Sequence, residues 1–180
     1  HRLQLRVVDV CRDDGAPAGD LVVSFDLLPD TDGADRREAV LGAVTVTDDR
    51  IYLPVANLGT VRVFDPSGER VTSYGYKGNN PGELNFPVAV AVTDGLVAVL
   101  DKHRFNVVCF GADGRFRGEF GGKGISPGWF YPPTLLGAGP EGRVFVGQVF
   151  ENRVQICRIP DFISIGVRPA AAAETHSQGS

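Results

Sequence analysis

The residues that could perform catalysis or bind a metal ion are few in this chain of 180 residues, and they are widely separated. The three histidines, His1, His103 and His176, do not stand at the spacing of metal ligands. The chain contains no Gly-x-Ser-x-Gly nucleophile motif, no phosphate-binding P-loop and no dinucleotide-binding glycine motif. The sequence therefore predicts no catalytic residue, no metal site and no cofactor within this stretch.

The three cysteines do not indicate a disulfide framework or a metal site. Cys11 and Cys157 lie beside arginines, Cys109 lies in an apolar run, and no Cys-x-x-Cys spacing occurs. We expect Cys109 to be a small buried side chain, and we expect Cys109 and Cys157 to be free thiols. The redox state of Cys11 stays open.

A glycine-rich motif, Gly-x-Lys-Gly-x-x-Pro-Gly, occurs twice, at 75–82 and at 121–128. Its composition resembles that of a phosphate-binding loop, but each copy leads into apolar, strand-like sequence and not into a helix N-terminus. We therefore interpret both copies as connections between structural repeats, where glycine supplies positive φ angles.

Each copy of this motif is followed by the same series of short apolar segments, which alternate with polar positions and are separated by turn residues. The best-preserved repeat has its four predicted strands at 88–92, 96–100, 106–110 and 115–120. The preceding repeat has them at 39–46, 50–55, 60–64 and 70–75, and the following one has three at 134–138, 143–147 and 153–157. Repeats of about 40–50 residues with four strands each are the blades of a β-propeller. The sequence thus predicts an all-β fold, a β-propeller of four-stranded antiparallel blades.

Two segments resemble the repeats of the NHL family. They are Asp101 to Phe110 (DKHRFNVVCF) and Phe150 to Ile156 (FENRVQI), and the resemblance covers roughly residues 39–160. This chain departs from the family's pattern at the end of the second strand, where the family's Asp survives only as Asp101. Val55 and Gln148 replace it in the other repeats.

The resemblance also implies how the chain is divided. The first residues, His-Arg-Leu-Gln-Leu, resemble the family's third strand, so we expect a half blade at 1–29. Blades at about 30–75, 76–121 and 122–165 follow, and 166–180 has the composition of a linker. Because NHL propellers usually have about six blades, we expect these three and a half blades to be part of a longer, six-bladed propeller.

The blade pattern sorts the loops onto two faces. The blade-to-blade connections and the loops between second and third strands meet on one face, which we call the connection face. It receives all three lysines of the chain, with Lys102, Tyr131 and Arg153 among its residues. The remaining turns carry mainly acidic residues, namely Asp48, Asp49, Asp65, Asp94, Asp113 and Glu141. Exposed aromatic residues with arginine are typical of protein interfaces. We predict a partner-binding set of Tyr76, Lys77, His103, Arg104, Phe105, Lys123 and Trp129. Alternatively, Phe105 and Trp129 fold inward between blades.

Three functions remain open. The first is a non-catalytic scaffold that binds a protein partner as a subunit of a larger complex. The second, implied by lyases and hydrolases among NHL-like propellers, is an enzyme whose metal site lies in other blades. The third is RNA binding through the basic face. A net charge of −4 makes nucleic acid the least favoured partner, and whether a small molecule binds is open.

Composition bears weakly on the compartment. No apolar run approaches the ~18–20 residues that span a bilayer. The absence of methionine and the excess of arginine over three lysines suit an extracytoplasmic bacterial protein. We therefore expect a periplasmic or extracellular location.

Overall fold

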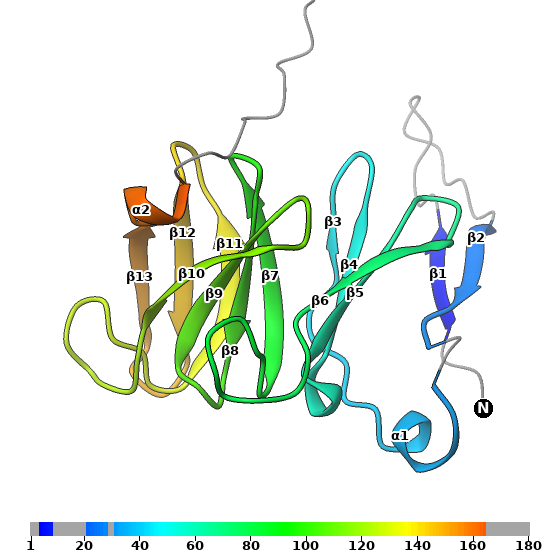
Figure 1. Cartoon of the computed structure of the whole chain (residues 1–180), viewed down its shortest axis with the longest axis horizontal. Coiled ribbons are helices and arrows are strands. Elements are labelled where there is room, and N and C mark those ends of the chain that lie inside the picture. Colours follow the sequence, from blue (N-terminus) through cyan, green and yellow to red (C-terminus); the bar gives the residue numbers. More distant parts are fainter. Residues whose placement is uncertain (1–3, 9–20, 29–30, 165–180) are drawn as a thin grey trace, which may run out of the picture.

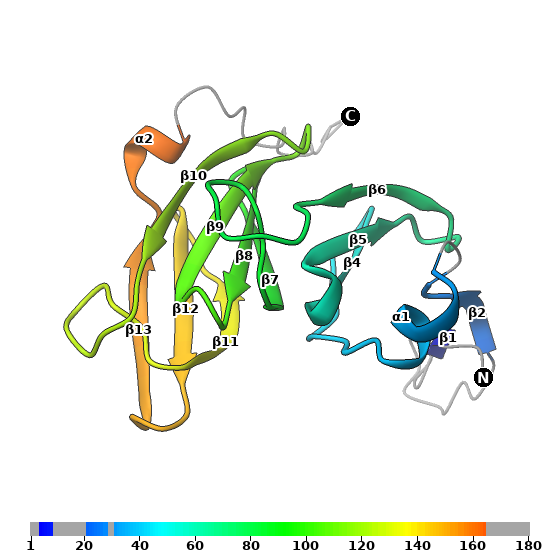
Figure 2. The same cartoon turned by 60° about the horizontal axis from the view of Figure 1, so that its bottom comes forward.

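The computed structural model describes residues 4–8, 21–28 and 31–164 (Figure 1). His1, His176, Cys11 and the predicted tail lie outside these residues. The described part consists of antiparallel sheets that follow one another in chain order (Figures 1 and 2).

Two four-stranded sheets form the middle of the molecule. The first contains β3 (Thr45–Val46), β4 (Ile51–Val55), β5 (Thr60–Phe64) and β6 (Arg70–Tyr74). The second contains β7 (Pro87–Thr93), β8 (Leu96–Asp101), β9 (Asn106–Gly111) and β10 (Phe116–Gly121). The strands predicted for the best-preserved repeat are therefore confirmed.

Smaller sheets flank these two. One has two strands, β1 (Gln4–Val8) and β2 (Leu21–Asp26), and the other has three, β11 (Pro133–Ala138), β12 (Arg143–Gln148) and β13 (Arg153–Arg158). After β13 the chain forms the short helix α2 (Asp161–Ser164), so a fourth strand of this sheet is not among the described residues. Ile163 of α2 and Ile159 just before it are buried in the same core layer as Val144 and Val146.

Helix is scarce in the described ranges. Besides α2 there are α1 (Gly33–Arg37) and the 3-10 turn η1 (Ala56–Leu58), and neither reaches two turns. No helix in these ranges is long and apolar enough to cross a membrane.

Tight turns explain why adjacent strands pair. Asp94 and Gly95 link β7 to β8, and both have positive φ angles, 48° and 75°. Glu141 and Gly142 repeat this between β11 and β12, with φ angles of 58° and 65°. Two-residue turns with two positive φ angles match the right-handed twist of paired strands, and they favour a small or polar residue followed by glycine.

The first strand of the β3–β6 sheet is shorter than predicted. The segment 39–46 forms only the two-residue β3 and an isolated bridge between Leu41 and Val55. Pro54 of β4 is the physical reason, because proline has no N–H to complete the ladder. Its carbonyl accepts from the Gly42 N–H at 2.9 Å, but Ala43 donates instead to the Val88 carbonyl of the next sheet at 2.8 Å.

The hydrophobic core lies in layers between neighbouring sheets. Side chains alternate along each strand, so Val97 and Val99 of β8 face the β3–β6 sheet while Ala98 and Leu100 face the β11–β13 sheet. Each side chain buried in this way contributes about 1.5–3 kcal/mol for a residue of valine or leucine size. The sheets are therefore held together face to face.

Candidate partner-binding face

The part of the connection face that carries the predicted residues is built from four loops at the lower end of the molecule in Figure 1. They are 75–86 between β6 and β7, 102–105 between β8 and β9, 122–132 between β10 and β11, and 149–152 between β12 and β13.

Asp101 fixes two of these loops. Its carboxylate is fully buried at the end of β8 and accepts backbone N–H groups from both sides. Asn85 and Phe86 donate at 2.6 Å and 3.0 Å, and His103 and Arg104 donate at 3.0 Å and 2.9 Å. One acid therefore ties the blade connection to the β8–β9 loop.

In the next sheet, Gln148 anchors the equivalent loops through its side-chain amide. Its Oε1 accepts from the Tyr131 N–H at 2.8 Å and from the Arg153 guanidinium at 3.0 Å. The Nε2 of Gln148 is buried and has no partner within the described residues. Gln148, which stands where the family has Asp, therefore still anchors the loops through Oε1, while its Nε2 donor is unpaired within the described residues.

Arg104 is occupied within the chain. Its guanidinium binds both carboxylate oxygens of Glu119 at 2.9 Å and donates to the Glu83 carbonyl at 2.7 Å. Its side chain is about nine-tenths buried. Arg104 therefore links the loops of this face from the inside of the chain, and it is not one of the exposed cations.

Phe105, Lys123 and Tyr131 form a stack. The Phe105 and Tyr131 rings are nearly parallel, with an angle of 7° and centroids 5.8 Å apart. The Lys123 Nζ lies 5.6 Å from the centre of the first ring and 5.7 Å from the centre of the second. Distances below about 6 Å allow cation–π attraction to both rings. Tyr131, which the predicted set omitted, is therefore part of the site.

Trp129 is half-exposed, with 49% of its surface accessible, and it lies on a firmly held loop. Its ring crosses Gly122 so closely that a β-carbon there would lie 2.8 Å from the ring. Gln155 of β13 accepts from the Gly128 N–H at 2.9 Å and donates to the Trp129 carbonyl at 2.7 Å. Phe105 is only partly buried as well, so the inward-folding alternative does not describe these two rings.

The remaining predicted residues lie further along the same face. Tyr76 is exposed and lines a hollow of about 360 Å³ with Phe110 and Phe116. The exposed Lys77 donates to the Asn85 carbonyl. His103 is exposed and stacks on Phe86, with ring centroids 4.3 Å apart.

Three exposed apolar residues of this face were not predicted. They are Ile125, Val149 and Phe150, each at least 60% accessible. Phe150 and Val149 stand at the repeat positions of His103 and Lys102, so the repeat alignment could have located them.

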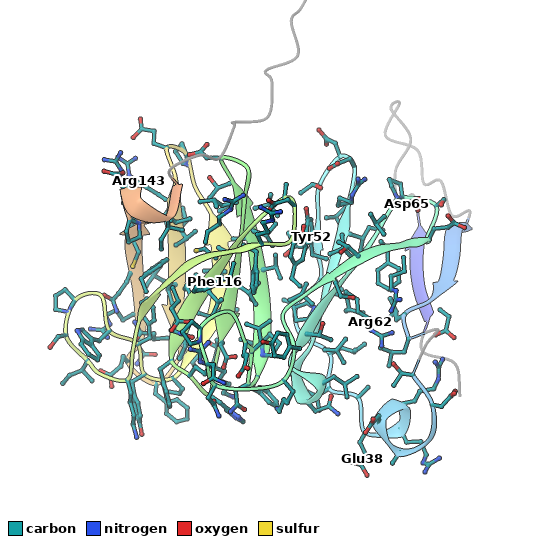
Figure 3. All side chains as sticks on the ribbon, viewed as in Figure 1. Glu38, Tyr52, Arg62, Asp65, Phe116 and Arg143 are labelled. Carbon is teal, nitrogen blue, oxygen red and sulfur yellow. The ribbon has the colours of Figure 1, made fainter. Side chains whose placement is uncertain are left out.

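The opposite face carries both signs of charge. Asp113 pairs with Arg117 at 2.9 Å, and Glu141 pairs with Arg143 at 2.8 Å. Figure 3 shows Arg143 and Asp65 at this end, away from Glu38. The backbone N–H of Arg115 holds the pKa of Asp113 below its usual value. The acids here belong to their own turns, as expected for Asp in turns.

The described cysteines are free. Cys109 and Cys157 both pack in the layer between the β7–β10 and β11–β13 sheets, so the two thiols face the same layer. Burial raises the pKa of Cys109 to about 12 and also raises the pKa of Cys157. Within the described ranges, no three side chains among His, Cys, Asp and Glu are placed to hold a metal ion.

Comparison with known proteins finds a relative that is similar in sequence over a short stretch, and solved structures that are distantly similar. No protein-family model matches the chain. The RING finger protein nhl-1 of Caenorhabditis elegans is 43% identical over 56 residues, which are 31% of this chain and 6% of that protein. The chain thus spans only a small part of that relative.

Among solved structures, the glutaminyl cyclase of Myxococcus xanthus superposes with a TM-score of 0.50 at 12% identity, over 72% of this chain and 48% of that one. Virginiamycin B lyase from Staphylococcus aureus superposes with a TM-score of 0.46 at 14% identity, over 67% of this chain and 41% of that one. Together with the repeated four-stranded antiparallel sheets, the first likeness shows the fold alone: this chain has the fold of a β-propeller.

Proposed function

We propose that this chain is a non-catalytic propeller module of the NHL type that binds a protein partner through its connection face. The observation that carries the proposal is the set of exposed aromatic residues on the connection-face loops, Trp129, Tyr131 and Phe150, together with the Lys123 contact to Phe105 and Tyr131. The NHL assignment is supported by the repeat resemblance and by the 56-residue likeness to nhl-1.

The aromatic surface has the properties of a binding anchor. Large rings bury much area on contact and lose little side-chain entropy, and interface hot spots are enriched in Trp, Tyr and Arg. The loop that carries Trp129 is already held by Gln155 and Arg153, whose guanidinium donates to the Ile125 carbonyl at 2.6 Å. Binding therefore requires little ordering of the loop, and that raises affinity.

The charges of this face favour an acidic partner. Lys77, Lys102 and Lys123 form no salt bridge within the described part of the chain. Two nearby acids are engaged internally, since Glu119 binds Arg104 and Glu83 accepts from the Asn80 N–H at 2.8 Å. An acidic protein segment with apolar side chains complements this surface.

Affinity capture with matched variants tests the proposal. The chain is used to capture proteins from an extract of its source, and the captured partner is then titrated against wild type, Trp129→Ala and Phe150→Ala. We expect each substitution to weaken binding by about 2 kcal/mol, or roughly 30-fold. Val46→Ala is the control, because Val46 is an exposed apolar residue at the end of β3, beside the Asp48–Asp49 turn of the opposite face.

Two results would count against it. Equal binding by wild type and Trp129→Ala would mean that the partner uses another surface. Competition of the partner by single-stranded RNA at low salt, lost at high salt, would favour the RNA alternative.

We also propose an extracytoplasmic location, on the strength of composition. Fractionation of the source cells, with detection of the chain by antibody, tests it. Recovery only with cytoplasmic markers would refute it.

A further inference from the structure

A hollow between the two four-stranded sheets shares no residue with the stack of Phe105, Lys123 and Tyr131. Its volume is about 360 Å³, which is within the range of ligand sites in proteins. It is lined from β6 and from β10, the outermost strands of their sheets, which lie along the upper edge of Figure 2. Its lining includes Tyr76, Pro81, Gly82, Phe110, Gly114 and Phe116. We call it the rim hollow.

Aromatic side chains form much of the lining of the rim hollow. Tyr76 is 66% accessible and Phe116 is 40% accessible, so both rings can be covered by a ligand. Phe110 is buried, belongs to the core layer between the two sheets, and meets Phe116 edge to face with ring centroids 6.4 Å apart. Because that layer is already packed and both sheets belong to this chain, the hollow is open only to a ligand that arrives from solvent. Its rings favour a large apolar side chain.

A backbone donor in the rim hollow has no acceptor. Gly82 is buried and lies in a tight turn in which the Glu83 N–H donates to the Asn80 carbonyl at 3.0 Å. The φ angle of Gly82 is 79°, as proline followed by glycine favours in such a turn. Its own N–H donates to no oxygen within the described residues. Buried backbone N–H groups are nearly always paired, so we expect an acceptor to enter the hollow.

The equivalent turn of the next blade connection shows which acceptor fits. Gly128 stands at the same position of the repeated glycine-rich motif and has a φ angle of 81°. Its N–H donates to the side-chain amide oxygen of Gln155 at 2.9 Å. Gln155 is the third residue of β13, whereas the third residue of β9 is Val108, whose side chain has no polar atom. An amide oxygen is therefore the acceptor that the first turn lacks, and every peptide bond carries one.

Positive charge stands beside both exposed rings. Lys77, next to Tyr76, is exposed and forms no salt bridge within the described part of the chain. Arg115 directly precedes β10, and its side chain is 82% exposed. Its nearest carboxylate, Asp113, is 3.9 Å away and is bound more closely by Arg117, at 2.9 Å. A ligand with carboxylates therefore complements the rim hollow, and a basic ligand does not.

We infer that the rim hollow binds a short acidic peptide segment, which places one large apolar side chain between Tyr76 and Phe116. A main-chain carbonyl of this segment accepts from the Gly82 N–H, and its carboxylates lie near Lys77 and Arg115. The inference does not rest on the proposed function, because the site uses neither Trp129 nor Phe150.

Selection from a phage-displayed library of random short peptides tests the inference. The library is first depleted on Tyr76→Ala, which should keep the fold because Tyr76 is exposed, and it is then selected on the wild-type chain. We expect the enriched peptides to carry aspartate or glutamate next to a large apolar residue. They are synthesised with a fluorescent label, and their affinities are measured by anisotropy.

Matched variants locate the bound peptide. Tyr76→Ala and Phe116→Ala should each weaken its binding about 10-fold or more. Trp129→Ala is the control, because Trp129 is an exposed aromatic residue of the next blade connection, and it should leave the affinity unchanged. The double variant K77Q/R115Q should weaken binding and remove most of its dependence on salt.

The Gly82 amide gives a readout that does not depend on substitution. In NMR spectra of the ¹⁵N-labelled chain, saturating peptide should shift the Gly82 signal and slow its hydrogen exchange, because the N–H gains an acceptor. The Gly128 signal should stay unchanged, since Gln155 already holds that N–H.

Three outcomes would overturn the inference. Failure to enrich any peptide that binds wild type better than Tyr76→Ala would mean that the rim hollow is not a peptide site. Enrichment of basic or uncharged peptides would refute the acidic ligand. Peptides that lose affinity on Trp129→Ala and keep it on Tyr76→Ala and Phe116→Ala would bind the aromatic residues of the connection face, a result that supports the proposed function and refutes this site.

Discussion

At the scale of single residues, Phe105 has an unusual backbone conformation. Its φ angle is 58°, in the left-handed region that bulky residues rarely adopt, at a cost of about 1–3 kcal/mol. The equivalent residue of the next sheet, Asn152, has a φ angle of 46°, and asparagine tolerates this region well. The backbone of Phe105 is therefore strained at a position where asparagine would adopt the same φ angle at little cost. The ring of Phe105 stacks on Tyr131.

Phe105→Asn separates stability from binding. We expect the free energy of unfolding to change by less than about 1 kcal/mol, because relief of backbone strain offsets the lost ring contact. Binding of the partner should weaken about 10-fold, since Tyr131 and Lys123 lose their support. Urea denaturation and titration calorimetry measure the two effects. A large loss of stability with unchanged affinity would show that the ring has only a structural role.

Cys109 predicts a pH dependence of stability. Its pKa in the folded chain is about 12 because the thiol is buried, whereas an unfolded cysteine ionises near its ordinary value of 9.0. Above pH 9 the unfolded state loses the proton that the folded state keeps, so stability falls as pH rises toward 12. The slope is about 1.4 kcal/mol per pH unit.

Cys109→Ala should remove this part of the slope between pH 9 and 11. Tyr52, whose pKa burial also raises to about 12, contributes a slope of its own in both proteins. Denaturant midpoints of wild type and Cys109→Ala at several pH values measure the difference. Parallel curves would contradict the assignment.

At the scale of elements, the β7–β10 and β11–β13 sheets each have a buried acceptor at the end of the second strand. Asp101 accepts four backbone N–H groups, and Gln148 accepts one backbone N–H and one guanidinium. In the first sheet Val55 stands at this position and cannot accept a hydrogen bond through its side chain. There the Val40 N–H is bound instead by the Asn57 side chain at 2.9 Å.

Asp101→Ala should destabilise the chain by about 3 kcal/mol or more, because several buried donors lose their acceptor. Asp101→Asn should cost clearly less, since an amide oxygen still accepts, as Gln148 does. Thermal or urea unfolding measures both variants. Equal losses would show that the negative charge, and not the acceptor geometry, holds the two loops.

At the scale of the whole molecule, charge is unevenly placed. The net charge is −4, yet the three lysines all lie in connection-face loops. Near the opposite face, acids pair with arginines of their own hairpins. An acidic partner is therefore attracted at short range by one face only.

Salt should weaken partner binding for this reason. The screening length falls from about 10 Å at 0.1 M salt to about 3 Å at 1 M. We expect wild-type affinity to fall over this range, and the triple variant K77Q/K102Q/K123Q to show little dependence on salt. Titrations at three salt concentrations check this. An unchanged slope in the triple variant would place the electrostatic contact elsewhere.

The sequence alone determined the local order of this protein. Strand positions such as 88–92 and 106–110 follow from alternation over a few residues, and the turns at Asp94-Gly95 and Glu141-Gly142 follow from the residues in them. These signals act between near neighbours, so they can be read without the fold. The same locality explains one error, since the effect of Pro54 on the segment 39–46 depends on strand pairing.

The tertiary structure decided which side chains are free to act. Arg104 was expected at the interface, but it is held by Glu119, which lies 15 residues away. Tyr131 joins Phe105 from 26 residues away. Val107 and Val154 occupy the same place in the repeat and differ only in whether another sheet covers them. Exposure and pairing depend on contacts between blades, and a repeat pattern, which is the same in every blade, does not contain that information.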